Sequence, residues 1–215
     1  MIESTASTTA ALTTLVASLA DNKYFLGRRY AEWCTSAPSL ESAVAAAAMA
    51  QDEIGHARSL YPVLEDLGGE SPENEPETRT TFSQSAFLSK PFDGWTDFVA
   101  ANFLFDTAMS VGLEAAVDSS YIALAQRARR ILEEEQLHWL HAEGWVRRLS
   151  SLGVSVRADL QERLQRIMPF SCGWFDLAVS DLVLSSILTQ GTDELRARFL
   201  ERIRPIVAVA GLGPL

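Results

Sequence analysis

Two pairs of glutamate and histidine, each spaced three residues apart, are the part of this sequence best suited to chemistry. Glu53 precedes His56, and Glu135 precedes His138. Residues three apart lie on the same face of a helix, so each pair offers a carboxylate and an imidazole to one point. Two such pairs, with one carboxylate from each of two further helices, form the ligand set of a two-metal carboxylate site. The sequence therefore predicts these four residues as metal ligands.

Asp106 is predicted as a fifth ligand because of its distance from the second pair. It interrupts an apolar run ending in Phe105, and it lies 29 residues before Glu135, with a helix break about midway between them. Residues equally far from the turn of an antiparallel hairpin lie level with each other. Asp106 should therefore face Glu135 and His138.

The first helix offers no glutamate at the corresponding level. Measured across the turn from Glu53, that level falls at Asn22 or Lys23, with Asp21 one residue further off. Asn22 continues the apolar series of its helix, whereas Asp21 would need about 100° of helical rotation to face the site. The ammonium of Lys23 would partly replace a cation. The sixth position thus stays open among these three residues.

Nearby polar residues are expected to lie further from the centre. Glu133, Glu134 and Glu143 are predicted on a solvated face, and His141 is predicted beside the ligands or at the surface rather than among them.

Four long helices, an extended connection and a helical tail are predicted to position these residues. Helix-forming residues dominate, and no stretch alternates in the manner of a strand. The expected helices run from about Thr9 to Trp33, Leu40 to Leu67, Trp95 to Val117 and Tyr121 to Ser150. Between the second and third, Glu70 to Asp93 is expected to form an exposed connection containing a short turn of helix.

Two helical hairpins joined by a long crossover make a ferritin-like four-helix bundle. We therefore predict an all-α fold and a single domain over residues 1–215, with a core bundle at about 9–150 and additional C-terminal helices at 154–215. The tail should hold two or three shorter helices, broken at Pro169 to Gly173 and near Gly191.

Composition narrows the class of protein. The chain has 215 residues, is 47% hydrophobic and carries a formal net charge of −10, which argues against a nucleic-acid groove. No apolar run approaches the ~20 residues that span a bilayer. The two cysteines form no disulfide framework, and the N-terminus lacks the pattern of a signal peptide. A soluble protein of the cytoplasm, without a membrane or nucleic-acid partner, is expected.

Several motifs resemble those of a known family. The opening hairpin contains Leu19-Ala20-Asp21-Asn22, Leu26-Gly27-x-Arg29, Glu32-Trp33-Cys34 and Ala37-Pro38-Ser39-Leu40. These motifs resemble the phenylacetic acid catabolic family, which contains the large and structural subunits of the bacterial phenylacetyl-CoA ring-epoxidase. The stretches Gln51-Asp52-Glu53-x-Gly55-His56, Phe105-Asp106 and Gly144-Trp145-x-x-Arg148-Leu149 also fit.

The resemblance is mixed. The opening segment is more similar to the non-catalytic structural subunit, which has a degraded metal site, whereas the Glu-x-x-His pairs are similar to the catalytic subunit. The resemblance places the ligands of the catalytic subunit at Glu53, His56, Asp106, Glu135 and His138. It places the family's first-helix glutamate at Lys23 or Asn22, which is a departure from the pattern.

Three functions follow from these observations. The first is a di-iron oxygenase component that activates O2 to oxygenate an aromatic or unsaturated acyl substrate, with two iron ions (manganese being the other metal considered) and an electron-donating reductase. The second is a non-catalytic structural subunit, with a buried salt-bridge network involving Lys23. The third is a ferritin-like protein that handles metals or oxidants. A homo- or hetero-oligomer with a related helical chain is expected, and no catalytic residue is assigned.

Overall fold

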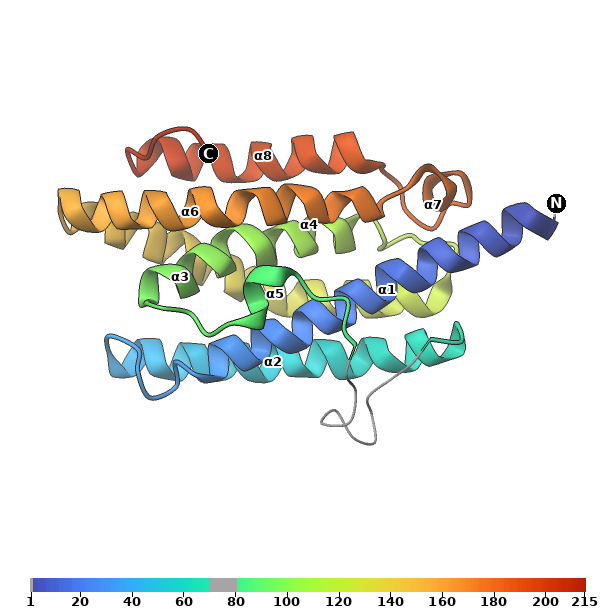
Figure 1. The fold of residues 1–215 in the computed structure, drawn as a ribbon, viewed down its shortest axis with the longest axis horizontal. Coiled ribbons are helices and arrows are strands. Elements are labelled where there is room, and N and C mark those ends of the chain that lie inside the picture. Colours follow the sequence, from blue (N-terminus) through green and yellow to red (C-terminus); the bar gives the residue numbers. More distant parts are fainter. Residues whose placement is uncertain (1, 70–80) are drawn as a thin grey trace.

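The computed structural model describes residues 2–69 and 81–215, and every regular element within them is helical (Figure 1). Three helices are long: α1 (Ile2–Ala31), α2 (Leu40–Asp66) and α5 (Ile122–Ser151). With one further rod they build the predicted ferritin-like helical bundle. The all-α prediction is confirmed, and the boundaries of α2 and α5 fall within one residue of the expected ones.

The fourth rod of the bundle is a single path built from three elements. It comprises α3 (Trp95–Ala100), the π-helical segment η2 (Ala101–Asp106) and α4 (Thr107–Glu114). Single turns of π-helix within α-helices are frequent at functional sites. Here the wide turn ends at Asp106, whose side chain is buried.

Short caps end the helices where the hairpins turn. The Ser39 hydroxyl accepts a hydrogen bond from the backbone N–H of Ser42 at 3.3 Å, which satisfies one of the free donors at the start of α2. Gly68 follows α2 with a φ of +79°, and Gly153 follows α5 with a φ of +131°. Glycine adopts these angles without steric penalty, so both helices end where the sequence predicts a break.

The C-terminal tail forms a second layer beside the bundle (Figure 1). It contains α6 (Val154–Trp174), η3 (Phe175–Leu177), α7 (Ser180–Leu184) and α8 (Thr192–Val209). The predicted break near Gly191 is confirmed, but the break expected from Pro169 onward is wrong. Pro169 lies on the exposed side of α6, where water can bond the freed carbonyl, while the buried Ile167 and Trp174 hold the helix against the core.

The N-terminal helix and the crossover also differ from expectation in detail. Helix α1 begins at Ile2 rather than near Thr9, and the Ser7 hydroxyl donates to Asp181 of α7 at 2.6 Å. The short turn predicted in the connection is the 3₁₀ segment η1 (Ala86–Ser89). Residues 70–80 of that connection lie outside the described residues.

The hydrophobic core runs through both layers. Phe98, Phe103 and Phe105 of the fourth rod are fully buried, as are Leu26 and Leu60 of the first hairpin. Among the described helices, none combines the length and the apolar character needed to cross a membrane.

Helices α1 and α2 approach each other most closely around Gly27. A Cβ added at Gly27 would lie 2.7 Å from Cγ1 of Ile54, 3.0 Å from the backbone oxygen of Ala50 and 3.1 Å from Cβ of Glu53. The missing side chain therefore lets α1 lie against the turn of α2 that carries Glu53. This contact sets the distance between Lys23, one turn before Gly27, and Glu53.

We predict that Gly27→Ala destabilises the protein by about 1–3 kcal/mol, because the added methyl group overpacks a contact that includes backbone. The measurement is the free energy of unfolding in urea. Gly55→Ala is the matched control on α2, since nothing lies within 4 Å of a Cβ added there. It should leave stability unchanged or raise it by up to about 1 kcal/mol. Equal effects of the two substitutions would contradict the close approach.

Candidate functional site

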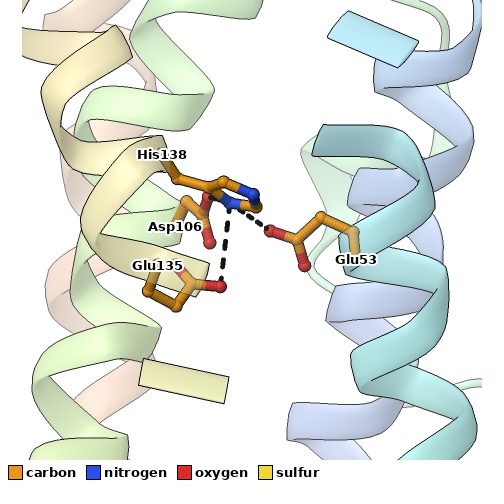
Figure 2. A group of neighbouring side chains, drawn as sticks. All are labelled: Glu53, Asp106, Glu135 and His138. Carbon is orange, nitrogen blue, oxygen red and sulfur yellow. Dashed lines mark hydrogen bonds and ion pairs between the residues drawn. The ribbon is translucent and has the colours of Figure 1, made fainter. Parts of the chain in front are cut away.

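Six ionisable side chains from all four rods of the bundle converge in its interior. Glu53 and His56 lie one turn apart on α2, Glu135 and His138 do the same on α5, and Asp106 comes from the end of η2 (Figure 2). Lys23 of α1 completes the group, which we call the buried ionic cluster. Each residue is at most 4% exposed: Lys23, Glu53, His56, Asp106, Glu135 and His138.

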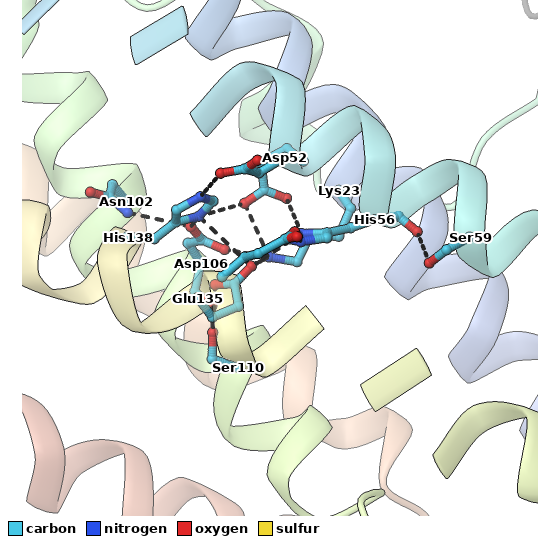
Figure 3. A network of polar contacts seen from close by, with 11 residues as sticks. Lys23, Asp52, His56, Ser59, Asn102, Asp106, Ser110, Glu135 and His138 are labelled. Carbon is cyan, nitrogen blue, oxygen red and sulfur yellow. Dashed lines mark hydrogen bonds and ion pairs between the residues drawn. The ribbon is translucent and has the colours of Figure 1, made fainter. Parts of the chain in front are cut away.

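The ammonium of Lys23 lies among the three carboxylates (Figure 3). Its Nζ donates to Oε1 of Glu53 at 3.0 Å, to Oδ1 of Asp106 at 2.5 Å and to Oε1 of Glu135 at 2.5 Å. An ammonium has three N–H donors, so each carboxylate can take one of them. Lys23 is one of only two lysines in the chain, and its side chain is completely buried.

Each histidine joins the centre of the cluster to a carboxylate nearer the surface. Nδ1 of His56 lies 3.3 Å from Oε1 of Glu135, and its Nε2 lies 2.7 Å from Oε2 of Glu134. Nδ1 of His138 lies 3.1 Å from Oδ2 of Asp106, and its Nε2 lies 3.4 Å from Oδ2 of Asp52. A histidine with carboxylates at both nitrogens is favoured in its doubly protonated, charged form.

The pKa values follow from this competition between burial and charge. Burial lowers the pKa of Lys23, but the attraction of Asp106, Glu135 and Glu53 outweighs it and holds that pKa well above its usual value. Burial also opposes protonation of His56, whereas hydrogen bonds to Glu135 and Glu53 raise its pKa to about 9. The pKa of His138 is raised well above its usual value, because Glu135 and Asp106 outweigh its burial.

The carboxylate side of the cluster responds in the opposite direction. Burial opposes ionisation of Glu135, but Lys23 and His138 lower its pKa to about 2. With three carboxylates, one ammonium and two imidazolium groups, the buried ionic cluster balances its own charge. Burying unbalanced charge would cost several kcal/mol per ion, so this balance is what allows the cluster to lie inside the bundle.

The donor set suits a metal ion, but the position of Lys23 does not suit two. Glu53, Asp106, Glu135 and His138 each offer a ligand atom within 4.8 Å of the others, and carboxylate and imidazole donors suit iron or manganese. Three of these residues, however, already bond the Lys23 ammonium. A two-metal centre therefore does not fit the residues as they are arranged, because the ammonium occupies the space between its carboxylates.

Of the three candidates for the sixth position, the structure brings Lys23 alone into the cluster. Asp21 accepts hydrogen bonds from the Tyr61 hydroxyl at 3.1 Å and the Ser83 N–H at 2.6 Å. Asn22 accepts from the Ser85 N–H at 2.7 Å. Both residues are buried, yet they fasten the end of the crossover to α1 rather than facing the carboxylates.

Sequence reasoning missed the residues that surround the cluster. Glu134, predicted on a solvated face, is half-exposed, but it also bonds His56. Asp52 has the same relation to His138, and the Ser110 hydroxyl lies 2.8 Å from Oε2 of Glu135. The adjacency of Asp52 to Glu53 and of Glu134 to Glu135 was the available signal. The pairing across helices could not be read from one helix at a time.

His141 lies beside the cluster, as predicted, and not among its members. Its Nδ1 is 3.1 Å from Oδ1 of Asn102, and its ring packs against Trp95 and Phe98. Burial lowers its pKa to about 4, and the charge of His138 contributes to the same effect. It is therefore neutral near pH 7.

A cavity of about 390 Å³ reaches the cluster from the side of α4, α5 and α8. Asp106, Ser110 and Glu135 line its inner end, and Leu132 and Trp139 contribute apolar walls. The cluster is thus adjacent both to this cavity and, through Asp52 and Glu134, to the surface between α2 and α5.

We predict that stability falls as the pH rises from about 6.5 through about 9. A histidine whose pKa is raised on folding stabilises the fold fully below its unfolded-state pKa and loses that contribution as pH passes the folded-state value, which is about 9 for His56. Glu135 acts in the reverse sense, so stability should also fall as pH drops from about 4.5 towards 2. Urea unfolding at a series of pH values measures both effects. In His56→Gln the alkaline loss should be smaller, and an unchanged profile would contradict the assignment.

We further predict that Lys23→Met destabilises the protein by about 3–5 kcal/mol, because it leaves buried carboxylates without their cation. Thermal and urea unfolding in the presence of a chelator measure the change. Lys90→Met is the matched control, since Lys90 is the other lysine and is exposed. It should alter stability by no more than about 0.5 kcal/mol.

A second measurement keeps this prediction testable if Lys23→Met fails to fold. An amine-reactive reagent applied to the native wild-type protein should modify Lys90 and spare Lys23, and unfolding should expose Lys23 to the reagent. Native modification of Lys23 would show that its ammonium is not held in the interior.

Comparisons with known proteins agree with the predicted family. A family model described as phenylacetic acid catabolic protein matches residues 2–214. The chain is also similar to two different subunits of the 1,2-phenylacetyl-CoA epoxidase of Escherichia coli (strain K12). The first is 27% identical over 178 residues, covering 81% of this chain and 71% of the relative. The second is 27% identical over 187 residues, covering 84% of this chain and 60% of the relative.

The chain therefore spans somewhat more than two thirds of the first epoxidase relative and less than two thirds of the second. The family match, in contrast, includes both Glu-x-x-His pairs, the fourth rod and the helical tail. Because it extends from residue 2 to residue 214, this chain belongs to the phenylacetic acid catabolic protein family.

Proposed function

We propose that this chain is a non-catalytic, structural component of a multi-subunit oxygenase similar to 1,2-phenylacetyl-CoA epoxidase. Both epoxidase relatives are subunits of one such enzyme, which supports a place in an assembly of related chains. The observation that carries the proposal is the ammonium of Lys23, which bonds the three carboxylates that a metal centre would require.

The charge balance of the cluster supports this function. The cluster is neutral when Lys23, His56 and His138 are protonated. Metal ligation needs neutral imidazoles and available carboxylate oxygens. A divalent ion would therefore have to displace the ammonium and remove a proton from at least one histidine. Each step works against interactions that the fold already makes.

A structural component gains from such a cluster in a different way. Side chains from α1, α2, η2 and α5 meet at one point, so the cluster fixes the relative position of all four rods. A rigid bundle offers a partner a preformed surface, which lowers the entropy lost on association. In this function the ionic cluster holds shape and performs no reaction.

A second candidate function is a metal-dependent oxygenase, and two observations favour it. Four buried donors lie within 4.8 Å of one another, and a cavity of about 390 Å³ opens beside three of them. In this function Glu53, His56, Asp106, Glu135 and His138 would hold iron, which would supply O2 activation for oxygenation of an aromatic or unsaturated acyl substrate. A reductase would then be a required partner. A ferritin-like metal or oxidant handler would need the same metal centre without the substrate.

Metal analysis distinguishes these functions. We predict that wild-type protein from cells grown with iron and manganese carries only trace amounts of either metal, because Lys23 satisfies the carboxylates. Lys23→Glu should raise the metal content several-fold, since it removes the ammonium and adds a sixth ligand. Elemental analysis of both proteins, purified side by side, gives the result, with Lys90→Glu as the matched control.

The contrary outcome is equally specific. Wild-type protein containing iron close to stoichiometric amounts, with the iron lost in Glu53→Ala and His138→Ala, would overturn the structural function. Consumption of O2 that depends on a reductase and an acyl substrate would then favour the oxygenase over the metal handler.

A further inference from the structure

Helix α2 presents an apolar face to solvent. Leu40 and Val44 are 77% and 62% exposed, and Ala48 and Gly55 continue the same face at spacings of four and seven residues. Residues at these spacings form one stripe along a helix. Single exposed apolar residues are ordinary, but a stripe of them on one helix indicates a contact surface.

Helix α5 continues this face beside α2. Leu137 is 67% exposed, and Gly144 lies two turns further along the same stripe. The two helices run side by side, because Asp52 contacts His138 and His56 contacts Glu134. Gly55 lies one turn from Asp52, and Leu137 lies one turn from Glu134, so both stripes border the same seam. We call this surface the α2–α5 face: Leu40, Val44, Ala48, Gly55, Leu137 and Gly144.

The two glycines of this face have no explanation within the chain. Gly55 and Gly144 lie inside long helices, where glycine is less favourable than alanine by about 1 kcal/mol. Nothing lies within 4 Å of a Cβ added at either position. Gly27, in contrast, is required by the close approach of α1 to α2. Glycines at open positions between exposed leucine and valine side chains allow another helix to approach closely.

The seam at the middle of the face carries negative charge. The side chains of Asp52 and Glu134 are 33% and 44% exposed, and each bonds the outer nitrogen of a cluster histidine. A second copy of this chain, packed about a two-fold axis on the seam, would bring the same carboxylates together. Like charges at the centre of an interface oppose association. A different chain with basic side chains at this point would be complementary.

We infer that the α2–α5 face docks a helical face of a different chain of the same family, with lysine or arginine opposite Asp52 and Glu134. This inference rests on the proposed function as a structural component. The two epoxidase relatives are subunits of one enzyme, and each is similar to more than 80% of this chain, which supports a partner with the same helical plan. The partner covers apolar stripes, glycines and seam carboxylates together.

The test uses the full chain and, as the probe, a family member from the same organism whose first helix carries glutamate where Lys23 lies here. Leu137→Asp and Val44→Asp should each weaken the complex by more than about tenfold, as measured by titration calorimetry after co-purification of the wild-type pair. Leu184→Asp on α7 is the matched control, because Leu184 is 83% exposed and lies away from the face. It should leave the affinity unchanged.

Gly144→Gln provides a readout that a role within the chain alone would not move. It should leave the melting temperature of the isolated chain unchanged or raise it by about 2 °C, because glutamine favours the helix. The same substitution should weaken the complex by more than about tenfold, because the side chain blocks close approach.

Three results would overturn the inference. They are no complex between the wild-type pair, equal affinity in Leu137→Asp and Leu184→Asp, or a dimer of this chain alone that Leu137→Asp dissociates. Metal content, measured on the same samples, tests the proposed function separately. An intact complex formed by a metal-loaded chain would refute the non-catalytic role and leave the docking face in place.

Discussion

The structure depends on the contact between the ammonium of Lys23 and the carboxylates of Glu53, Asp106 and Glu135. Three carboxylates in a water-poor interior repel each other, and burial alone would drive them to protonate. The ammonium and two imidazolium groups remove that tension. A buried ionic network is weak support for stability as such, because desolvation offsets much of its attraction. Its value lies in geometry, since the charges balance only when four rods stand in one register.

The cluster communicates with two sides of the molecule. The outer nitrogens of its histidines bond Asp52 and Glu134 on the seam between α2 and α5. On another side, Ser110 and Glu135 border a cavity beside α4, α5 and α8. Hence the residues that fix the bundle from within also shape the surface that we assign to a partner. An interior held together by balanced charge can in this way serve the assembly of a larger complex.

The chemistry-bearing residues were more predictable from sequence than the way they are connected. Helical spacing was sufficient to place Glu53 with His56 and Glu135 with His138, and equal distance from a turn was sufficient for Asp106. Spacing could not choose among Asp21, Asn22 and Lys23, because the choice depends on the crossing of α1 over α2 at Gly27. The bonds from Asp52 and Glu134 link different helices, which no single-helix pattern encodes. Pro169 was misjudged because its exposure, and not its identity, decides whether a helix continues.

The π-helical turn at Ala101–Asp106 has a consequence for how such a chain changes over evolutionary time. A residue inserted into an α-helix normally rotates everything after it by about 100°, and so scrambles all later contacts. A widened turn absorbs the surplus residue locally and leaves the flanking segments α3 and α4 in phase with their neighbours. Insertions and deletions at this turn would therefore re-aim Asp106 while sparing the rest of the rod. That makes the turn the natural place for lineages to gain or lose an inward-pointing acid.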